Sequence, residues 1–222
     1  MRWICLALCI SVLFGCVGCS RDVGAPLQTG VVLIDPGHGG FDGGAVAEDG
    51  TTEKHLNLAI AQCLRDMLYI CGVSVEMTRQ TDIGLESSYA DSIREKKSSD
   101  MQQRLSMYEE ADLVISIHQN HFSIPKYSGT QVFYSPNHPD SAALAETIRQ
   151  SVIKYIQPQN TRELKQATDG IYLLYHTDTP TVLVECGFLS NPEEREKLKM
   201  PAYQQQMAFS ILAGFWNYHM EK

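Results

Sequence analysis

Three runs of mostly apolar residues, rich in β-branched side chains, constrain the fold of this chain more than any other sequence feature. They occupy residues 31–34, 113–117 and 181–185. A strand with one face in water alternates polar and apolar residues, whereas an uninterrupted apolar run is typical of a strand that is buried on both faces. The chain therefore requires helices on both sides of a central sheet.

Apolar side chains at helical spacing between these runs supply the covering layers. Residues 52–70 are the clearest case, and Gly72 is expected to cap that helix at its C-terminus. Further elements are expected as helices at 102–111, 141–155 and 203–218 and after Asn191, as strands at 73–77 and 130–134, and as loop or partial helix at 83–100. This alternation predicts an α/β fold with a mostly parallel central sheet and helices on both faces.

The first 24 residues are expected to lie outside this domain. Arg2 is followed by eighteen uncharged residues, Trp3 to Ser20, which is typical of an export signal. The stretch ending at Cys16 also resembles a lipoprotein signal, and an uncleaved membrane anchor is the third alternative, at the lower limit of length for a bilayer span. Residues 1–24 are thus a signal peptide, lipoprotein signal or membrane anchor, and residues 25–222 form one domain.

The charge of the chain excludes some partners. Its formal net charge is −8, and tight binding to nucleic acid or to an anionic membrane depends on clustered cations. We therefore expect no nucleic-acid partner, and membrane contact only through the N-terminal leader.

Metal-competent or acid/base residues follow each of the three buried runs. The first run leads to His38, the second leads to His118, and the third ends at Glu185. The carboxyl ends of parallel strands meet at one edge of a sheet, where ligands bind in such folds. We expect these three side chains to converge there.

A catalytic zinc site usually has three protein ligands, commonly two histidines and a carboxylate, and an open position for water. His38 and His118 supply the histidines, and Glu53 opens the helix after the first strand. His55 lies two positions further along and faces away, and His121 is expected on the opposite side of its strand from His118. We predict one Zn²⁺ ion held by His38, Glu53 and His118, with a structural role for each histidine as the alternative.

Glu185 ends a strand of uncharged residues and is followed by further apolar residues. Limited water should raise the pKa of its carboxyl toward the value that suits a general base. An exposed carboxylate or a structural salt bridge is the alternative interpretation. Neither a dinucleotide site nor a serine hydrolase is indicated, because Asp42 stands where a third glycine would be needed and no Gly-x-Ser-x-Gly motif occurs.

Five segments around these residues form a set. They are residues 34–40 (Ile-Asp-Pro-Gly-His-Gly-Gly), 53–54 (Glu-Lys), 78–79 (Thr-Arg), 116–120 (Ser-Ile-His-Gln-Asn) and 185–192 (Glu-Cys-Gly-Phe-Leu-Ser-Asn-Pro). Together they resemble the zinc N-acetylmuramoyl-L-alanine amidases of the type 3 family. The resemblance implies a phosphorylase/hydrolase-like fold, with residues 25–222 as the amidase catalytic domain. It also implies zinc on His38, Glu53 and His118, and Glu185 as catalytic acid/base.

The activity implied by this resemblance is hydrolysis of the amide between N-acetylmuramic acid and the L-alanine of the peptidoglycan stem peptide. Arg79 is a candidate for binding a stem-peptide carboxylate, with a structural ion pair as an equal alternative, and Asn120 is a candidate for orienting a ligand or substrate. A zinc carboxypeptidase or amidohydrolase acting on wall peptides, and an inactive peptidoglycan-binding protein, are the competing functions.

Residues 94–97, 161–162 and 169–174 look like the sporulation amidase that prepares muramic-δ-lactam in the spore cortex. This narrower resemblance implies a role in germination and a location in the cell envelope or forespore intermembrane space, secreted or tethered. The chain has no recognisable wall-binding repeat, so the leader or an envelope partner or activator protein is expected to direct it to its substrate.

Overall fold

A six-stranded sheet runs through residues 30–221, the part of the chain that the computed structural model describes. The leader expected at residues 1–24 lies outside the described residues. The strands are β1 (Val31–Pro36), β2 (Ser74–Met77), β3 (Leu113–Asn120), β4 (Gln131–Tyr134), β5 (Lys165–Gln166) and β6 (Thr181–Phe188). Their spatial order is β2-β1-β3-β6-β4-β5, and neighbours run parallel except for β4 and β6. The predicted mostly parallel sheet is confirmed.

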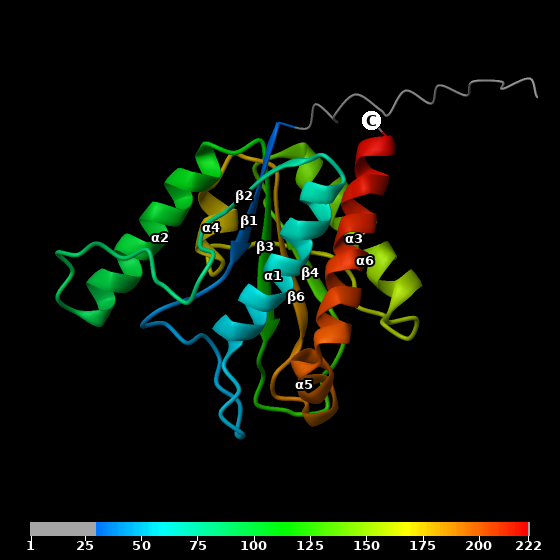
Figure 1. The fold of residues 1–222 in the computed structure, drawn as a ribbon, viewed down its shortest axis with the longest axis horizontal. Helices are drawn as coiled ribbons and strands as arrows, with labels where there is room; N and C mark the ends of the chain where they lie inside the picture. Colours follow the sequence, from blue (N-terminus) through cyan, green and yellow to red (C-terminus); the bar gives the residue numbers. More distant parts are fainter. Residues whose placement is uncertain (1–29, 222) are drawn as a thin grey trace, which may run out of the picture.

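Helices cover both faces of this sheet, as predicted (Figure 1). Within the described residues they are α1 (Glu53–Ile70), α2 (Ile93–Glu109), α3 (Pro139–Tyr155), α4 (Tyr172–His176), α5 (Pro192–Lys199) and α6 (Pro201–Met220). Helices α1, α3 and α6 pack on one face, whereas α2 and α4 pack on the other. None of the helices within residues 30–221 combines the length and apolar content that a bilayer span requires.

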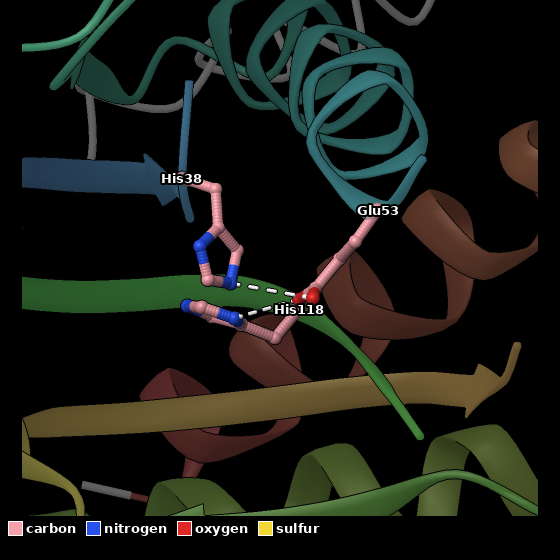
Figure 2. A group of neighbouring side chains, drawn as sticks. All are labelled: His38, Glu53 and His118. Carbon is pink, nitrogen blue, oxygen red and sulfur yellow. Dashed lines mark hydrogen bonds and ion pairs between the residues drawn. The ribbon is translucent and has the colours of Figure 1, made fainter. Parts of the chain in front are cut away.

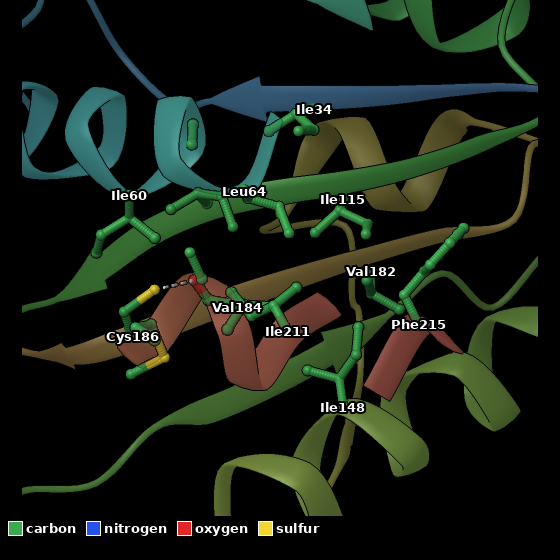
Figure 3. Packing of buried hydrophobic residues seen from close by; sticks show 14 of the residues in the cluster. Ile34, Ile60, Leu64, Ile115, Ile148, Val182, Val184, Cys186, Ile211 and Phe215 are labelled. Atoms are coloured by element: carbon green, nitrogen blue, oxygen red, sulfur yellow. Dashed lines mark hydrogen bonds between the residues drawn. The ribbon is translucent and has the colours of Figure 1, made fainter. Parts of the chain in front are cut away.

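The apolar runs are buried on both faces for the expected reason. Successive residues of β1 point in opposite directions, so Ile34 packs in the large core with Ile60 and Leu64 of α1, while Leu33 packs with Tyr108 of α2. Figure 3 shows the large core between the sheet and helices α1, α3 and α6. Each fully buried aliphatic side chain contributes about 1.5–3 kcal/mol to folding.

A buried polar network joins β1 to α2 beneath the carboxyl edge of the sheet. The fully buried Asp35 carboxylate accepts hydrogen bonds from Arg104, Tyr108 and two hydroxyl groups, those of Thr78 and Ser116. Burial alone would raise the pKa of Asp35, but the Arg104 guanidinium and these donors hold that pKa well below its usual range. The network fixes the chain at the point where β1 leaves the sheet.

One local prediction needs correction, and two short elements were missed. The helix expected at 102–111 begins at Ile93, because Ser92 and Glu95 form a capping box that starts it nine residues earlier. The short elements β5 and α4 were not predicted, since two and five residues carry too little periodicity to be recognised.

Candidate metal centre

The two histidines and the glutamate predicted as metal ligands lie together at the carboxyl edge of the sheet (Figure 2). His38 follows the end of β1, His118 belongs to β3, and Glu53 is the first residue of α1. One ligand atom from each of the three lies within 4.8 Å of those of the other two. Residues 15 and 65 positions from Glu53 are thus brought to one point.

The Glu53 carboxylate stands between the two imidazoles. Its Oε1 is 2.9 Å from Nδ1 of His118, and its Oε2 is 3.3 Å from Nε2 of His38. The two rings meet edge to face, with 5.0 Å between their centroids. Two imidazole nitrogens and a carboxylate facing one another form the donor set that zinc takes in catalytic sites.

Two glycines make room for this cluster. A Cβ on Gly37 would lie 2.1 Å from Nε2 of His118, so any larger residue there would displace that ring. Gly44 has φ +66, and a Cβ on it would lie 2.6 Å from Oε2 of Glu53. Gly37 and Gly44 are therefore required by the packing of the candidate ligands.

His38 is held from two sides. Its Nδ1 contacts Oδ2 of Asp42 at 2.9 Å, which directs Nε2 toward Glu53. Its backbone has φ 62, and its carbonyl oxygen accepts a hydrogen bond of 2.8 Å from Nη2 of the buried Arg104. A carboxylate on the far nitrogen of a ligating histidine fixes the ring and its tautomer. The Asp42 and Arg104 contacts therefore set the direction of a ligand.

Glu53 is almost fully buried, and its oxygens have further partners. Oε2 accepts from the backbone nitrogen of Ala45 at 2.8 Å, and Oε1 accepts from that of Gln119 at 3.0 Å. Asn57, one helical turn later, donates to Oε1 at 3.3 Å and accepts from the Gln119 side chain at 3.1 Å. These bonds restrict the carboxylate to the orientation that faces both histidines.

The pKa shifts reflect this arrangement. Burial alone would raise the pKa of Glu53, but hydrogen bonds and charge from His118 and His38 hold it well below its usual range. Burial would lower the pKa of His38, but hydrogen bonds to Asp42 and Glu53 raise it to about 9. A glutamate that stays ionised is suited to binding a metal ion, and a cation that binds His38 must displace its proton.

Glu185 lies beside this cluster. It is directly opposite His118 in the register of β3 and β6, and both side chains line a cavity of about 260 Å³. Its Oε2 is buried and has no hydrogen-bond partner among the described residues. Burial raises the pKa of this carboxyl to about 7, with Glu53 adding to the shift and both histidines opposing it. An unpartnered carboxylate with a pKa near neutrality can accept and release a proton at physiological pH.

Arg79 has a structural role, unlike the role in substrate binding considered from the sequence. It is 2% exposed, and its guanidinium donates to the carbonyl oxygens of Pro36, Gly37, Lys54 and Thr81. These bonds clamp the segment after β1 to the start of α1. The guanidinium is therefore not available to a substrate carboxylate, and no ion pair involves it within residues 30–221.

The remaining candidates do not belong to the cluster. Asn120 ends β3, and its carbonyl oxygen accepts from Leu189 at 2.8 Å, so its role toward ligand or substrate stays a prediction. His55 is exposed and contacts Thr52 and Asp82, and His121 is exposed near Phe122. The spacing arguments excluded both histidines from the ligand set, and neither belongs to the cluster.

Sequence reasoning did not identify three supporting residues: Asp42, Asn57 and Gln119. Asp42 lies in the loop after β1, where sequence spacing does not predict side-chain contacts. Asn57 did carry a signal, because it lies four positions after Glu53 in the predicted helix. On a helix that spacing brings side chains together. Gln119 gave no such signal, since its contact with Asn57 depends on how α1 packs against β3.

Comparison with known proteins supports the same assignment. A family model described as N-acetylmuramoyl-L-alanine amidase matches residues 32–217. The germination-specific N-acetylmuramoyl-L-alanine amidase of Bacillus subtilis (strain 168) is 38% identical over 89% of this chain and 83% of its own length. The amidase AmiA of Escherichia coli (strain K12) is 30% identical over 85% of this chain and 75% of its own.

A solved structure shares the fold closely. The CwlD amidase from Clostridioides difficile, in complex with the GerS lipoprotein, superposes with a TM-score of 0.84 at 36% identity, covering 87% of this chain and all of that one. The fold, the clustered residues and a family match that spans nearly all of the described residues agree with one another. The chain belongs to the N-acetylmuramoyl-L-alanine amidase family.

Proposed function

We propose that this chain is a zinc-dependent hydrolase of the amide between N-acetylmuramic acid and the L-alanine of the peptidoglycan stem peptide. The observation that carries the proposal is the cluster of His38, Glu53 and His118 with the unpartnered carboxylate of Glu185 beside it. Membership in the family supports the choice of substrate. The two histidines and the glutamate support the choice of metal, one Zn²⁺ ion held by those three residues.

The residues of the chain divide the work of an amide hydrolysis. A zinc ion supplies Lewis acidity, which polarises a carbonyl group and lowers the pKa of a water molecule. Glu185 takes the proton of the attacking water through its free Oε2 and returns it to the leaving nitrogen of L-alanine. Asp42 and Asn57 hold His38 and Glu53 in place throughout.

Product analysis tests this proposal. The purified zinc-loaded chain is incubated with muropeptides, and the products are identified by mass spectrometry. An amidase releases the intact stem peptide with a new L-alanine amino terminus. Release of a single amino acid would identify a carboxypeptidase instead, and binding to peptidoglycan without turnover would identify an inactive wall-binding protein.

We further propose that the enzyme acts in the spore cortex, where it takes part in forming the muramic-δ-lactam that germination requires. The germination-specific relative of Bacillus subtilis supports this role. A deletion strain should then form spores whose cortex lacks muramic-δ-lactam, measured by mass spectrometry of cortex muropeptides. Normal δ-lactam content in such spores would reject the cortex role while leaving the amidase activity in place.

An envelope partner is part of the same proposal. The relative from Clostridioides difficile was solved in complex with a lipoprotein, which supports an exported location and a partner protein for this chain. Affinity purification of the full chain from sporulating cells should recover a specific envelope protein. Recovery of peptidoglycan fragments alone would argue against a partner.

A further inference from the structure

A second cavity, of about 470 Å³, opens at the same end of the molecule as the metal centre. Its walls come from the segment after β3, the segment after α3 and the first turns of α5, which lies at the carboxyl ends of the strands in Figure 1. Lys126, Arg162 and Lys197 line it. These three cations gather in one cavity although the chain as a whole has a formal net charge of −8.

The Arg162 guanidinium has a fixed position in this cavity. Its Nε donates to the carbonyl oxygen of Ser128 at 2.7 Å, and its Cζ lies 4.5 Å from the centroid of the Phe188 ring. No carboxylate among the described residues forms an ion pair with it. A guanidinium fixed on an aromatic face, with its terminal nitrogens unpaired, matches the geometry of a carboxylate.

The acidic residues of the cavity cancel only part of this charge, because Glu194 interacts with both Lys197 and Arg162. Both oxygens of Glu194 are committed to its walls, because they accept from the backbone nitrogens of Gly129 and Phe188 at 2.8 Å each. Burial also raises the pKa of this carboxyl. Glu193 is exposed at the rim. Three cations against two carboxylates leave the cavity with an unmatched positive charge beside Arg162.

The cavity lies within reach of the reaction. Glu185 and Phe188 are three residues apart on β6, a distance of about 10 Å along a strand. Gln131 of β4 pairs with Glu185, and Gly129, two residues earlier, lines the cavity. An extended peptide covers about 3.3–3.6 Å per residue, so a group about three or four residues from the scissile amide reaches the cavity.

We propose that this cavity binds a free carboxylate of the stem peptide, with Arg162 as its anchor and Lys126 and Lys197 as supporting cations. The inference rests on the proposed amidase function. Stem peptides carry free carboxylates on their acidic residues and at their C-terminus. The glycan on the other side of the scissile amide presents uncharged hydroxyl groups instead. The cavity therefore sets the direction of the substrate, with the peptide running from Glu185 toward α5.

A pair of muropeptides that differ only in free or amidated stem carboxylates tests the proposal. The zinc-loaded full chain should hydrolyse the free form with a kcat/KM about tenfold higher, the size expected from one charge-assisted hydrogen-bonded pair. Arg162→Gln should lose this preference by slowing only the free form, and Arg162→Lys should retain part of it. Arg149→Gln is the matched control, because Arg149 pairs with Glu146 on the surface of α3.

The double variant Lys126→Gln/Lys197→Gln changes only exposed side chains and tests the same cavity without risk to folding. It should reduce the preference severalfold, since each cation adds attraction without a fixed contact. Equal hydrolysis of the two muropeptides by the wild-type chain, or an unchanged preference in both Arg162→Gln and the double variant, would overturn the carboxylate site alone. Failure of the zinc-loaded wild-type chain to cleave either muropeptide would overturn the proposed function and the site with it.

Discussion

Two glutamates with buried carboxyl oxygens at the metal centre have opposite protonation behaviour, and their immediate neighbours explain why. Burial favours the neutral form of both carboxyls. Glu53 has two imidazoles and two backbone nitrogens on its oxygens, which keep it ionised. Glu185 has no donor on Oε2, so burial dominates and its pKa rises to about 7. The same residue type can therefore serve as a metal ligand in one position and as a proton carrier in the other.

Substitution Glu185→Gln should separate these roles. The amide keeps the shape of the side chain and leaves His38, Glu53 and His118 untouched, so zinc content by elemental analysis should stay at the wild-type level. Without a proton acceptor, kcat/KM on muropeptides should fall about 10²- to 10⁴-fold. Glu110→Gln, at an exposed position after α2, is the control. Turnover near the wild-type rate in Glu185→Gln would remove Glu185 from the mechanism.

The pH dependence of turnover follows from the same carboxyl. A general base works in its ionised form, so activity falls as pH decreases through the pKa of Glu185. That pKa is about 7 without metal, and a bound cation lowers it, so the acidic limb of kcat/KM should lie below 7 but above the ordinary glutamate value of about 4.3. A pH–rate profile of the zinc-loaded enzyme, with folding monitored by circular dichroism, measures it. A limb at the ordinary glutamate value would contradict the buried environment.

Asp42 is the residue on which the direction of His38 depends. Asp42→Asn replaces the carboxylate that accepts a hydrogen bond from Nδ1 of His38 with a neutral amide. The weaker bond holds the ring less firmly. Zinc affinity should fall about 10- to 100-fold, measured by competition with a chromogenic chelator. Asp66→Asn, on the exposed surface of α1, should leave the affinity unchanged. Equal affinities of Asp42→Asn and the wild type would show that the backbone alone orients the ring.

At the scale of elements, helix α2 is fastened to the sheet through buried charge as well as apolar contacts. Arg104 is 1% exposed and bridges Asp35 of β1, Asp100 of its own helix and the carbonyl oxygen of His38. The helix is otherwise polar, and its apolar contacts with the sheet centre on Tyr108. A helix of this composition depends on its buried ion pair for docking, since removal of one partner leaves an uncompensated charge.

Arg104→Met should therefore lower the free energy of unfolding by about 3–5 kcal/mol, measured by urea denaturation at pH 7. Arg65→Met, which breaks an exposed pair on α1, should cost less than about 1 kcal/mol. The buried pair of Asp35 and Arg104 also links the free energy of unfolding to pH. Because the folded pKa of Asp35 is depressed, its contribution is present above the unfolded value of about 3.9 and is lost as pH falls below it. A similar loss in both variants would mean that the buried pair does not stabilise the fold.

The strands and the clustering of the candidate ligands were predictable because they depend on local patterns, whereas the residues that support those ligands were not. Long apolar runs and helical spacing identified β1, β3, β6 and α1, and the strand ends led directly to His38, His118 and Glu185. The start of α2 was placed nine residues late, because its mostly polar first turns show no apolar side chains at helical spacing. Only the Ser92 capping box marks this start. Arg79 illustrates the remaining limit, since its four carbonyl partners come from three segments that meet only in the folded chain.

At the scale of the whole molecule, the metal centre is a junction between parts that are far apart in sequence. Its three candidate ligands come from the segment after β1, the start of α1 and the strand β3 in the middle of the sheet. Contacts between the Glu53 carboxylate and the two imidazoles join these three elements. A metal ion would connect the same three elements with stronger bonds, so metal binding and global folding should be thermodynamically linked.

This linkage predicts that zinc stabilises the whole domain. A ligand that binds only the folded state, at a free concentration of 1,000 times its Kd, adds about 4 kcal/mol to the free energy of unfolding. Chelator-treated protein should thus unfold at a lower temperature than the zinc-loaded protein, and the difference should grow with zinc concentration in calorimetry. Glu53→Gln should lose the zinc-dependent increment, whereas His55→Ala should keep it, because His55 contacts only Thr52 and Asp82. An increment that survives in Glu53→Gln would mean that the stabilising zinc binds elsewhere on the chain.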